Sequence, residues 1–306
     1  MRFGEGRFAL FVIGSLLLGA CSSAPTQETT SKPSNNGSPG GFGNTPGNET
    51  SPTGTDGCSA EARLVYVVSQ ERDLYSFNPG SLTFTKIGQI NCNAAGNPNS
   101  MAIDRAGTAW VNYSDGSLFK VSTTTASCTE TGFEKGQSGF VKFGMAFATN
   151  GEGSTEETLY VASVDEVGDG GRGLGKIDLT TMKLTPLGDY SGNLQGEAAE
   201  LTGTGDGKLF GFFTTAPHAT LAQIDKSKGA TSNDRPLTGV STGLAWAFSF
   251  WGGDFWFYTS DGFSASSVTQ LRTSANNELS VVKQNVGNFR IVGAGVSTCA
   301  PLTPPR

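Results

Sequence analysis

The sequence predicts an all-β fold built from repeated four-stranded sheets, and three observations support this. Gly, Ser, Thr and Phe are plentiful while only 16% of residues are charged, a composition that favours strands over helices. From residue 58 onward, short apolar runs alternate with turns rich in Gly, Asn and Asp. One unit recurs with spacings of 44 to 56 residues, which suits one four-stranded blade of a β-propeller.

The repeated unit contains a strand that ends in an aliphatic or aromatic anchor residue, a polar turn and a Thr-rich strand. Its clearest copy is LGKIDLTTMKLTPLG at residues 174–188. This pattern resembles the L-Y-x-I-D-x-x-T-x-x-x-T-x-x-G repeat of extracellular bacterial propellers over residues 63–302. The resemblance implies an architecture and no particular activity. The anchors, separated by 44, 56, 47 and 47 residues, are Phe77, Val121, Ile177, Ile224 and Leu271.

Further strands complete each blade. One precedes each anchor, at 64–68, 109–113, 159–163, 209–213 and 255–258. Small-residue segments suited to crowded inner strands precede four of these, at 100–103, 144–147, 198–201 and 244–246. The first unit lacks an inner strand, whereas the C-terminal segment 289–296 is left over. We therefore expect the two termini to share one blade, which closes the ring and removes free sheet edges. This gives five blades, with six as the alternative.

The N-terminus has the features of an export signal. Arg2 and Arg7 accompany an apolar run at 8–18, which is too short to span a bilayer and is typical of a signal peptide. The run ends in Leu18-Gly19-Ala20-Cys21, which resembles the lipobox of bacterial lipoproteins. The alternative is an ordinary secretory signal cut near Ala20 or Ala24.

The lipobox resemblance implies cleavage before Cys21, acylation of that cysteine and attachment to a membrane through the acyl chains. Ser22 stands where an Asp would favour the inner membrane, so the resemblance implies an outer-membrane anchor in the cell envelope. Residues 22–57 consist largely of Ser, Thr, Pro, Gly and Asn and are expected to form a flexible tether. The expected organisation is a signal peptide at 1–20, the lipidated cysteine and linker at 21–57, and a propeller at 58–306.

Four further cysteines predict two disulfides, because an exported chain with an even count favours pairing. If the termini share a blade, Cys58 and Cys299 flank the junction of its first two strands, which leaves Cys92 to pair with Cys128. Free buried thiols are the alternative. No C-x-x-C motif is present, so a zinc site has no support.

The loops between the second and third strands of each blade share one face with the loops between blades. Ligands of propellers usually bind on that face, and four of the five loops hold an acidic residue. A ring of carboxylates would suit a cation or sugar hydroxyl groups, although Asp-Gly pairs are also ordinary turn residues. The candidate binding residues are Glu71, Asp73, Asp115, Asp165, Glu166, Asp169, Arg172, His218 and Asp261.

Cofactor binding has weak support. Asp165, Asp169 and Gly170 fit the start of a calcium loop, but Val167 carries no donor oxygen and Lys176 stands where a bidentate Glu is needed. An EF-hand is therefore excluded, and an irregular Ca²⁺ site is the one cofactor left open. His218 is the single histidine, which suits a general base or a solvated loop residue.

The strongest enzymatic alternative is a glycan-directed hydrolase. Glu197 and Glu200 flank an inner strand and are placed to point into the axial channel, and paired carboxylates are the machinery of glycosidases. The aromatic residues between 246 and 258 are expected to pack between blades rather than to hold a sugar, and Trp251 is the one expected to be exposed.

The net charge and composition narrow the classes of binding partner that are expected. The net charge of −6 argues against a nucleic acid bound through its phosphates. We expect a lipid-anchored binding or scaffolding module of the cell envelope whose partner is a protein or a glycan.

Overall fold

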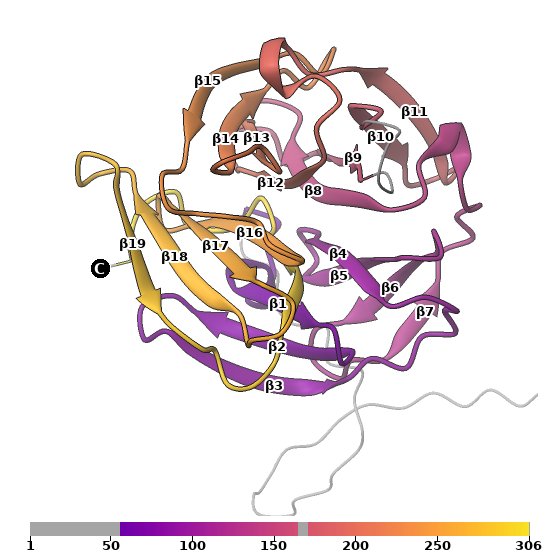
Figure 1. Cartoon of the computed structure of the whole chain (residues 1–306). Helices are drawn as coiled ribbons and strands as arrows, with labels where there is room; N and C mark the ends of the chain where they lie inside the picture. Colours follow the sequence, from indigo (N-terminus) through magenta and orange to yellow (C-terminus); the bar gives the residue numbers. More distant parts are fainter. Residues whose placement is uncertain (1–55, 165–170, 306) are drawn as a thin grey trace, which may run out of the picture. The chain divides into compact units, whose positions relative to one another are not determined.

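Five antiparallel sheets of four strands each surround a central axis (Figure 1). The computed structural model of the chain describes residues 56–164 and 171–305. The prediction of an all-β, five-bladed β-propeller is confirmed. Cys21, the signal segment and most of the tether lie outside the described residues.

Each blade is given from its inner to its outer strand. Blade 1 consists of β20 (Ile291–Gly295), β1 (Val65–Ser69), β2 (Asp73–Asn78) and β3 (Thr83–Gln89). Blade 2 consists of β4 (Pro98–Ile103), β5 (Thr108–Tyr113), β6 (Leu118–Ser122) and β7 (Cys128–Glu130). Blade 3 consists of β8 (Phe143–Thr149), β9 (Glu157–Ser163), β10 (Leu174–Asp178) and β11 (Lys183–Gly188).

Blade 4 consists of β12 (Ala199–Gly203), β13 (Leu209–Phe213), β14 (Thr220–Ile224) and β15 (Thr231–Pro236). Blade 5 consists of β16 (Ala245–Trp251), β17 (Asp254–Ser260), β18 (Ser267–Arg272) and β19 (Glu278–Lys283). Three short 3-10 helices, η1 (Glu61–Arg63), η2 (Gln137–Gly139) and η3 (Gly192–Leu194), lie in the connections.

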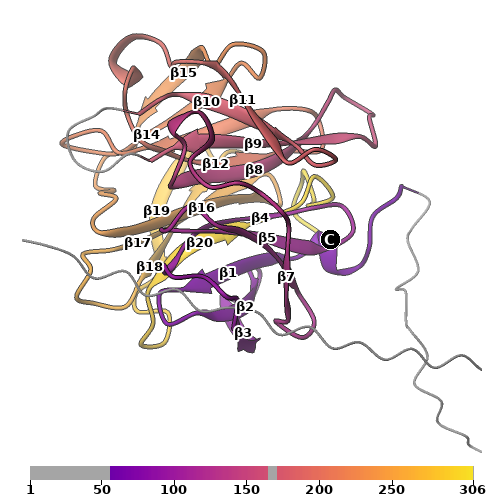
Figure 2. The ribbon, with the colours of Figure 1, turned by 90° about the vertical axis from the view of Figure 1, so that its right-hand side faces the viewer.

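The ring is closed by pairing between the two ends of the domain. Strand β20 pairs antiparallel with β1, with Val67 opposite Ala294. β1 begins and β20 ends at the same side of the ring, where both ends of the described chain lie (Figure 2). The Cys58–Cys299 disulfide joins the flanking segments, with its Cα atoms 5.9 Å apart. The expected sharing of one blade by the termini is therefore confirmed, as is the Cys92–Cys128 pair.

The inner strands approach one another so closely that small residues are required. A Cβ atom added at Gly144 of β8 would collide with the Ala199 carbonyl oxygen of β12, and one at Gly203 would collide with the Phe147 carbonyl oxygen. The small-residue segments expected at the axis are thus the inner strands, although that of blade 5 extends to Trp251 rather than ending at residue 246.

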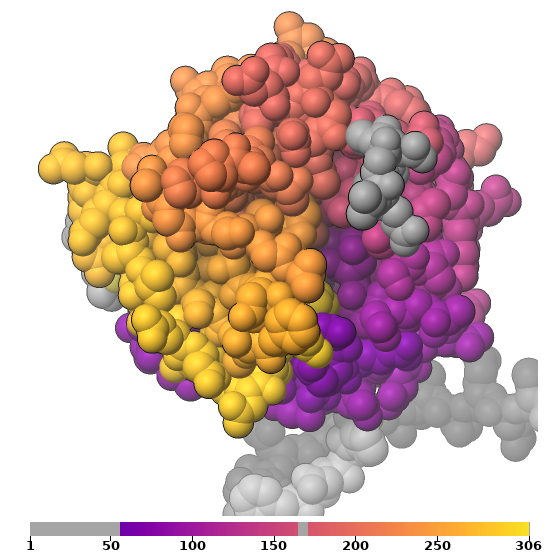
Figure 3. Space-filling view, viewed as in Figure 1, coloured from indigo at the N-terminus to yellow at the C-terminus, as the bar shows by residue number. Residues whose placement is uncertain are grey.

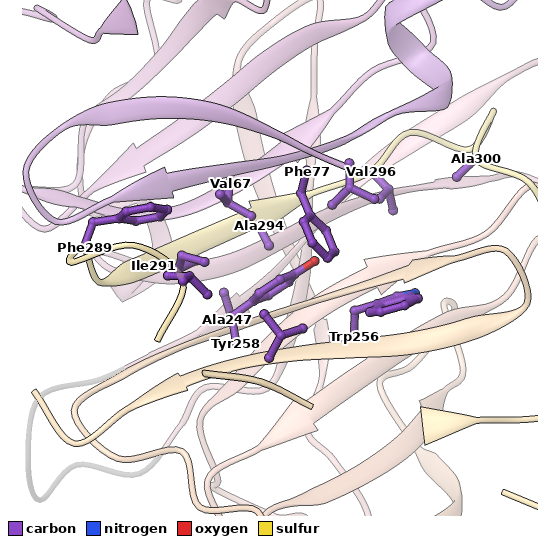
Figure 4. Close-up of a cluster of buried hydrophobic side chains, with 13 residues drawn as sticks. Val67, Phe77, Ala247, Trp256, Tyr258, Phe289, Ile291, Ala294, Val296 and Ala300 are labelled. Carbon is purple, nitrogen blue, oxygen red and sulfur yellow. The ribbon is translucent and has the colours of Figure 1, made fainter. Parts of the chain in front are cut away.

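Large side chains fill the spaces between blades. Between blades 5 and 1, the Phe77 ring meets the rings of Trp256 and Tyr258 edge-on, each at 5.8 Å between centroids (Figure 4). Between blades 4 and 5, Phe212 lies 4.8 Å from Phe257. The expectation that the aromatic cluster packs between blades is confirmed for these residues.

Trp251, the member of the cluster expected to be exposed, is half-buried, as are Trp246 and Phe250. Strand β16 continues through it, and its indole Nε1–H donates to the Arg63 carbonyl oxygen at 2.9 Å. The ring packs against the core cluster between blades 5 and 1. The N-terminal segment before β1 therefore covers part of this side chain.

A half-buried acid connects the C-terminal segment with blades 2 and 3. Glu157 accepts hydrogen bonds from the Arg105 backbone N–H and the Thr298 hydroxyl, both at 2.8 Å. Burial raises the pKa of Glu157 to about 7.

The described residues contain no helix that is long and apolar enough to cross a membrane.

We predict that the Cys58–Cys299 disulfide, which closes the ring, stabilises the fold more than the Cys92–Cys128 disulfide does. It links residues 241 apart in sequence, against 36 for Cys92–Cys128. The chain-entropy model then assigns about 5 kcal/mol to the first and about 4 kcal/mol to the second. Urea unfolding of Cys58→Ala/Cys299→Ala, with Cys92→Ala/Cys128→Ala as the matched control, measures the difference. A larger loss of stability in the control pair would contradict the prediction.

Candidate functional site

A pocket of about 270 Å³ lies where the axial channel opens on the face of the loops between second and third strands. Figure 3 looks onto this face, which is hollowed near its centre. All five blades contribute lining residues, which makes the pocket a product of the closed ring. Those with polar side chains are Gln70, Asn97, Asn99, Ser114, Lys142 and Glu200, and the others include Leu244, Trp246 and Val292.

Most of the polar lining residues lie beside the ends of inner or second strands. Gln70 and Ser114 directly follow β1 and β5, while Asn97 and Asn99 lie at the start of β4 and Lys142 directly precedes β8. In each case the strand direction delivers the residue to the same end of the channel.

Asn99 is held in place by the fold. Its side-chain N–H₂ donates to the Asn112 amide oxygen and to the Phe143 carbonyl oxygen, each at 3.2 Å. Asn112 is itself fully buried and also accepts the Phe143 N–H. This network commits the Asn99 nitrogen to the protein and orients its amide beside the pocket.

Glu200 is the buried acid of the pocket, with 3% of its surface exposed. The Ser100 hydroxyl donates to its Oε2 at 2.7 Å, and Ser100 in turn accepts the Met145 N–H at 3.2 Å. These residues lie on the inner strands of blades 4, 2 and 3, so the contact crosses the channel. Burial raises the pKa of Glu200 well above its ordinary value, against a smaller lowering by the Ser100 hydrogen bond.

Glu197 does not join Glu200. It lines a separate pocket of about 440 Å³ at the edge of blade 4, with His218 and Asp234. The Thr214 hydroxyl donates to its Oε2 at 3.3 Å. The expected pointing of both glutamates into the channel is therefore met by Glu200 and not by Glu197. Glu200 is the second residue of β12 and lies at the axial channel, whereas Glu197 lies two residues before the strand begins.

His218 has a structural partner. Its Nδ1 accepts the Gly239 N–H at 3.3 Å. It lies apart from the channel mouth, on the same face.

The acidic loop residues are held by local contacts. Glu71 pairs with Arg290 at 3.7 Å, Asp73 pairs with Lys86 at 2.7 Å, and Asp115 pairs with Lys135. Although partial burial opposes it, hydrogen bonding from Lys135 and then Ser117 lowers the pKa of Asp115 to about 2. Each carboxylate thus has a cationic partner within the fold.

Asp261 stabilises a turn. Its carboxylate accepts the Ser264 and Phe263 backbone N–H groups at 2.7 and 2.9 Å, and these bonds lower its pKa. This is ordinary turn chemistry. Arg172 lies against Gly139, whereas Asp165, Glu166 and Asp169 lie outside the described residues. Among residues 56–164 and 171–305, no group of three or more His, Cys, Asp or Glu side chains is arranged to hold a metal ion.

A larger pocket, of about 780 Å³, opens between blades 1 and 5 on the opposite face. It is lined by Phe77, Trp251 and Trp256, and by Pro304 of the C-terminal segment. Its buried acid is already satisfied, since Asp254 accepts hydrogen bonds from Gln270 at 2.9 Å and from the Thr273 N–H at 3.0 Å. The channel mouth, in contrast, is lined mainly by polar side chains that come from several blades.

The residues that the sequence reasoning missed are Gln70, Asn97, Asn99, Ser114, Lys142 and Trp246. The signal that identifies most of them is their position, one or two residues outside the inner or second strands. A search restricted to acidic side chains passes over amides and hydroxyls.

No protein-family model and no curated protein matches the sequence. Solved structures that are similar include TolB from Acinetobacter baumannii, with 12% identity and a TM-score of 0.42, where the match covers 72% of this chain and 52% of that one. A virginiamycin B lyase from Staphylococcus aureus shows 14% identity and a TM-score of 0.40, covering 76% and 75%. Kuenenia stuttgartiensis hydrazine synthase shows 13% identity and a TM-score of 0.39, covering 73% and 67%. These similarities concern the fold alone.

We predict that Glu200 makes the protein less stable as pH rises. The ordinary pKa of a glutamic acid is 4.5, and burial raises the pKa of folded Glu200 well above it. As pH rises past 4.5, Glu200 therefore loses its proton in the unfolded chain before it does so in the folded protein. Its stabilising contribution is therefore full below pH 4.5 and falls as pH rises toward the folded-state pKa, at up to about 1.4 kcal/mol per pH unit. Glu157 acts in the same direction between pH 4.5 and about 7.

The test is urea unfolding of wild type and Glu200→Gln from pH 4 to pH 8. The amide resembles the neutral acid and does not titrate, so the variant is expected to gain stability relative to wild type as pH rises. Parallel stability curves for the two proteins would contradict the prediction.

Proposed function

We propose that the chain is a lipid-anchored binding module of the bacterial cell envelope that holds a polar ligand at the channel mouth without transforming it. The observation that carries the proposal is the channel-mouth pocket, whose polar lining consists mainly of amide and hydroxyl side chains. Ligand pockets of proteins combine apolar walls with a few placed polar groups. Trp246, Val292 and Leu244 supply such walls here.

The carboxylate arrangement favours binding over hydrolysis. Glycosidases place two carboxyl groups on either side of one bond, about 5–9.5 Å apart. Among the described residues that line the channel mouth, Glu200 is the single carboxylate, and Glu197 lines another pocket. Within residues 56–164 and 171–305, no second acidic side chain lines this pocket beside Glu200, although both the retaining and the inverting mechanism require one.

The anchor is argued from the sequence Leu18-Gly19-Ala20-Cys21. Acyl chains on Cys21 would hold the protein at a membrane, since two or more chains anchor firmly. The described chain begins next to β1 at the side of the ring opposite the channel mouth. Attachment at that side leaves the pocket free for a ligand.

Binding at the channel mouth is tested with an array of envelope glycans probed with the purified full chain. We expect at least one glycan to be retained and recovered unchanged. The exposed lining residues are altered in Gln70→Ala/Asn97→Ala, which is expected to weaken binding by about tenfold through lost hydrogen bonds. Gln195→Ala, exposed on the same face outside the pocket, is the control. Cleaved glycan, or equal binding by both variants, would contradict the proposal.

Anchoring is tested by cell fractionation. Wild type is expected in the outer-membrane fraction, and Cys21→Ser is expected in the soluble fraction because the acylated thiol is lost. Ser23→Ala, which leaves the cysteine in place, serves as the control. Recovery of Cys21→Ser in the membrane together with wild type would refute a lipid anchor.

A further inference from the structure

Glu200 offers a hydrogen-bonding group to the pocket that the protein does not use. Its Oε2 accepts the Ser100 hydroxyl, whereas its Oε1 has no hydrogen-bond partner among the described residues. The side chain is 97% buried yet lines the channel-mouth pocket. Oε1 is not among the buried side-chain atoms that lack a partner, so it is accessible from the pocket, where a ligand or water can hydrogen-bond to it.

We infer that the channel mouth takes an uncharged sugar residue, whose hydroxyl groups exchange hydrogen bonds with the Glu200 carboxyl group and the neighbouring amides. This inference rests on the proposed binding function and names the ligand class of the same pocket.

The hydrogen-bonding capacity of the site matches a hydroxyl group. A protonated carboxyl group, with Oε2 occupied by the Ser100 donor, presents its O–H from Oε1. A sugar hydroxyl accepts that hydrogen bond and donates its own hydrogen to an acceptor such as the Asn99 amide oxygen. Asn99 is suited to accept because both contacts of its nitrogen are within the fold.

The charges in the pocket disfavour an ionic ligand. Glu200 and Lys142 are the two ionisable side chains among its described lining residues. An ammonium group would require Glu200 to ionise in a buried position, which burial opposes, and would lie near the Lys142 ammonium. A ligand carboxylate would have to give up its hydration to reach the buried Glu200 side chain, which is costly for a charged group.

The size and walls of the pocket fit one ring. A volume of about 270 Å³ corresponds to about nine water molecules at their share of liquid volume and lies just below the range of ordinary small-molecule sites. Half-buried Trp246 lies at one wall, where its ring meets Phe212 edge-on at 5.8 Å. An indole beside amides suits the apolar and polar sides of a sugar.

The experiment compares matched sugars that differ in charge. Binding of glucose, galactose, mannose, N-acetylglucosamine, glucosamine and glucuronate to the purified full chain is measured by ligand-observed NMR at pH 6.5. At least one neutral sugar is expected to bind at least about tenfold more tightly than glucosamine and glucuronate. Preference for a charged sugar, or no binding by any neutral sugar, would overturn the inference.

Variants at one position assign the contact. Glu200→Gln retains a donor and an acceptor, so it is expected to weaken binding of the neutral sugar by no more than about threefold, and Glu200→Leu by at least about tenfold. Glu197→Gln, three residues earlier and outside the pocket, is the control and is expected to match wild type. If Glu200→Gln abolished binding of the neutral sugar, as the loss of an ionic contact would, the inference would be overturned. This variant provides the test even if Glu200→Leu fails to fold.

The outcomes separate this inference from the proposed function. Glycans that are retained on the array but bind equally well to wild type and Glu200→Leu would overturn the sugar assignment and leave the binding module intact. Absence of any retained glycan, with no neutral sugar bound, would overturn both.

Discussion

Pairing of β20 with β1 is the constraint on which the rest of the structure depends. Without it, β16 and β4 would each lack a neighbouring inner strand, and the sheet of blade 1 would have only three strands. The pairing brings residues that are more than two hundred positions apart into one register, as Val67 and Ala294 show. Because a long loop must close before these contacts form, the Cys58–Cys299 disulfide and the Glu157 contacts with Arg105 and Thr298 act on the step that is entropically the most demanding.

The channel mouth is a consequence of that closure. Gln70 and Val292 reach the pocket from blade 1, and Trp246 reaches it from blade 5. The Glu200–Ser100 hydrogen bond spans blades 4 and 2 across the axis. A polar pocket with a buried carboxyl group therefore exists only while the five inner strands remain in a ring, which links the stability of the fold to the chemistry of the site.

Much of the fold was predictable because it is encoded locally and repeatedly. The recurrence of anchors such as Ile177 and Ile224 indicates the blades, and the missing inner strand of the first unit indicates closure by the last segment. Two errors have a physical origin. Strand β16 runs to Trp251 because the segment before β1 covers that side chain and accepts its indole N–H. No local pattern contains this contact, since it joins residues 188 positions apart.

The site was less predictable for a related reason. Acidic residues such as Asp115 and Asp261 suggested a carboxylate ring, but turns use such side chains for their own hydrogen bonds. Glu200 was identifiable as a candidate, whereas its partner Ser100 lies on a blade that is not its neighbour in the ring. Only the dimensions of the ring bring the two together, and these depend on the close approach at Gly144 and Gly203.

Native-state hydrogen exchange of the backbone amides in β20 tests the closed ring most directly. If β20 is an integral inner strand, those of its amides that donate to β1 exchange only through global unfolding, as slowly as the amides of β4 that donate to β5. Exchange of β20 through a lower-energy local opening, while β4 and β12 stay protected, would contradict the account.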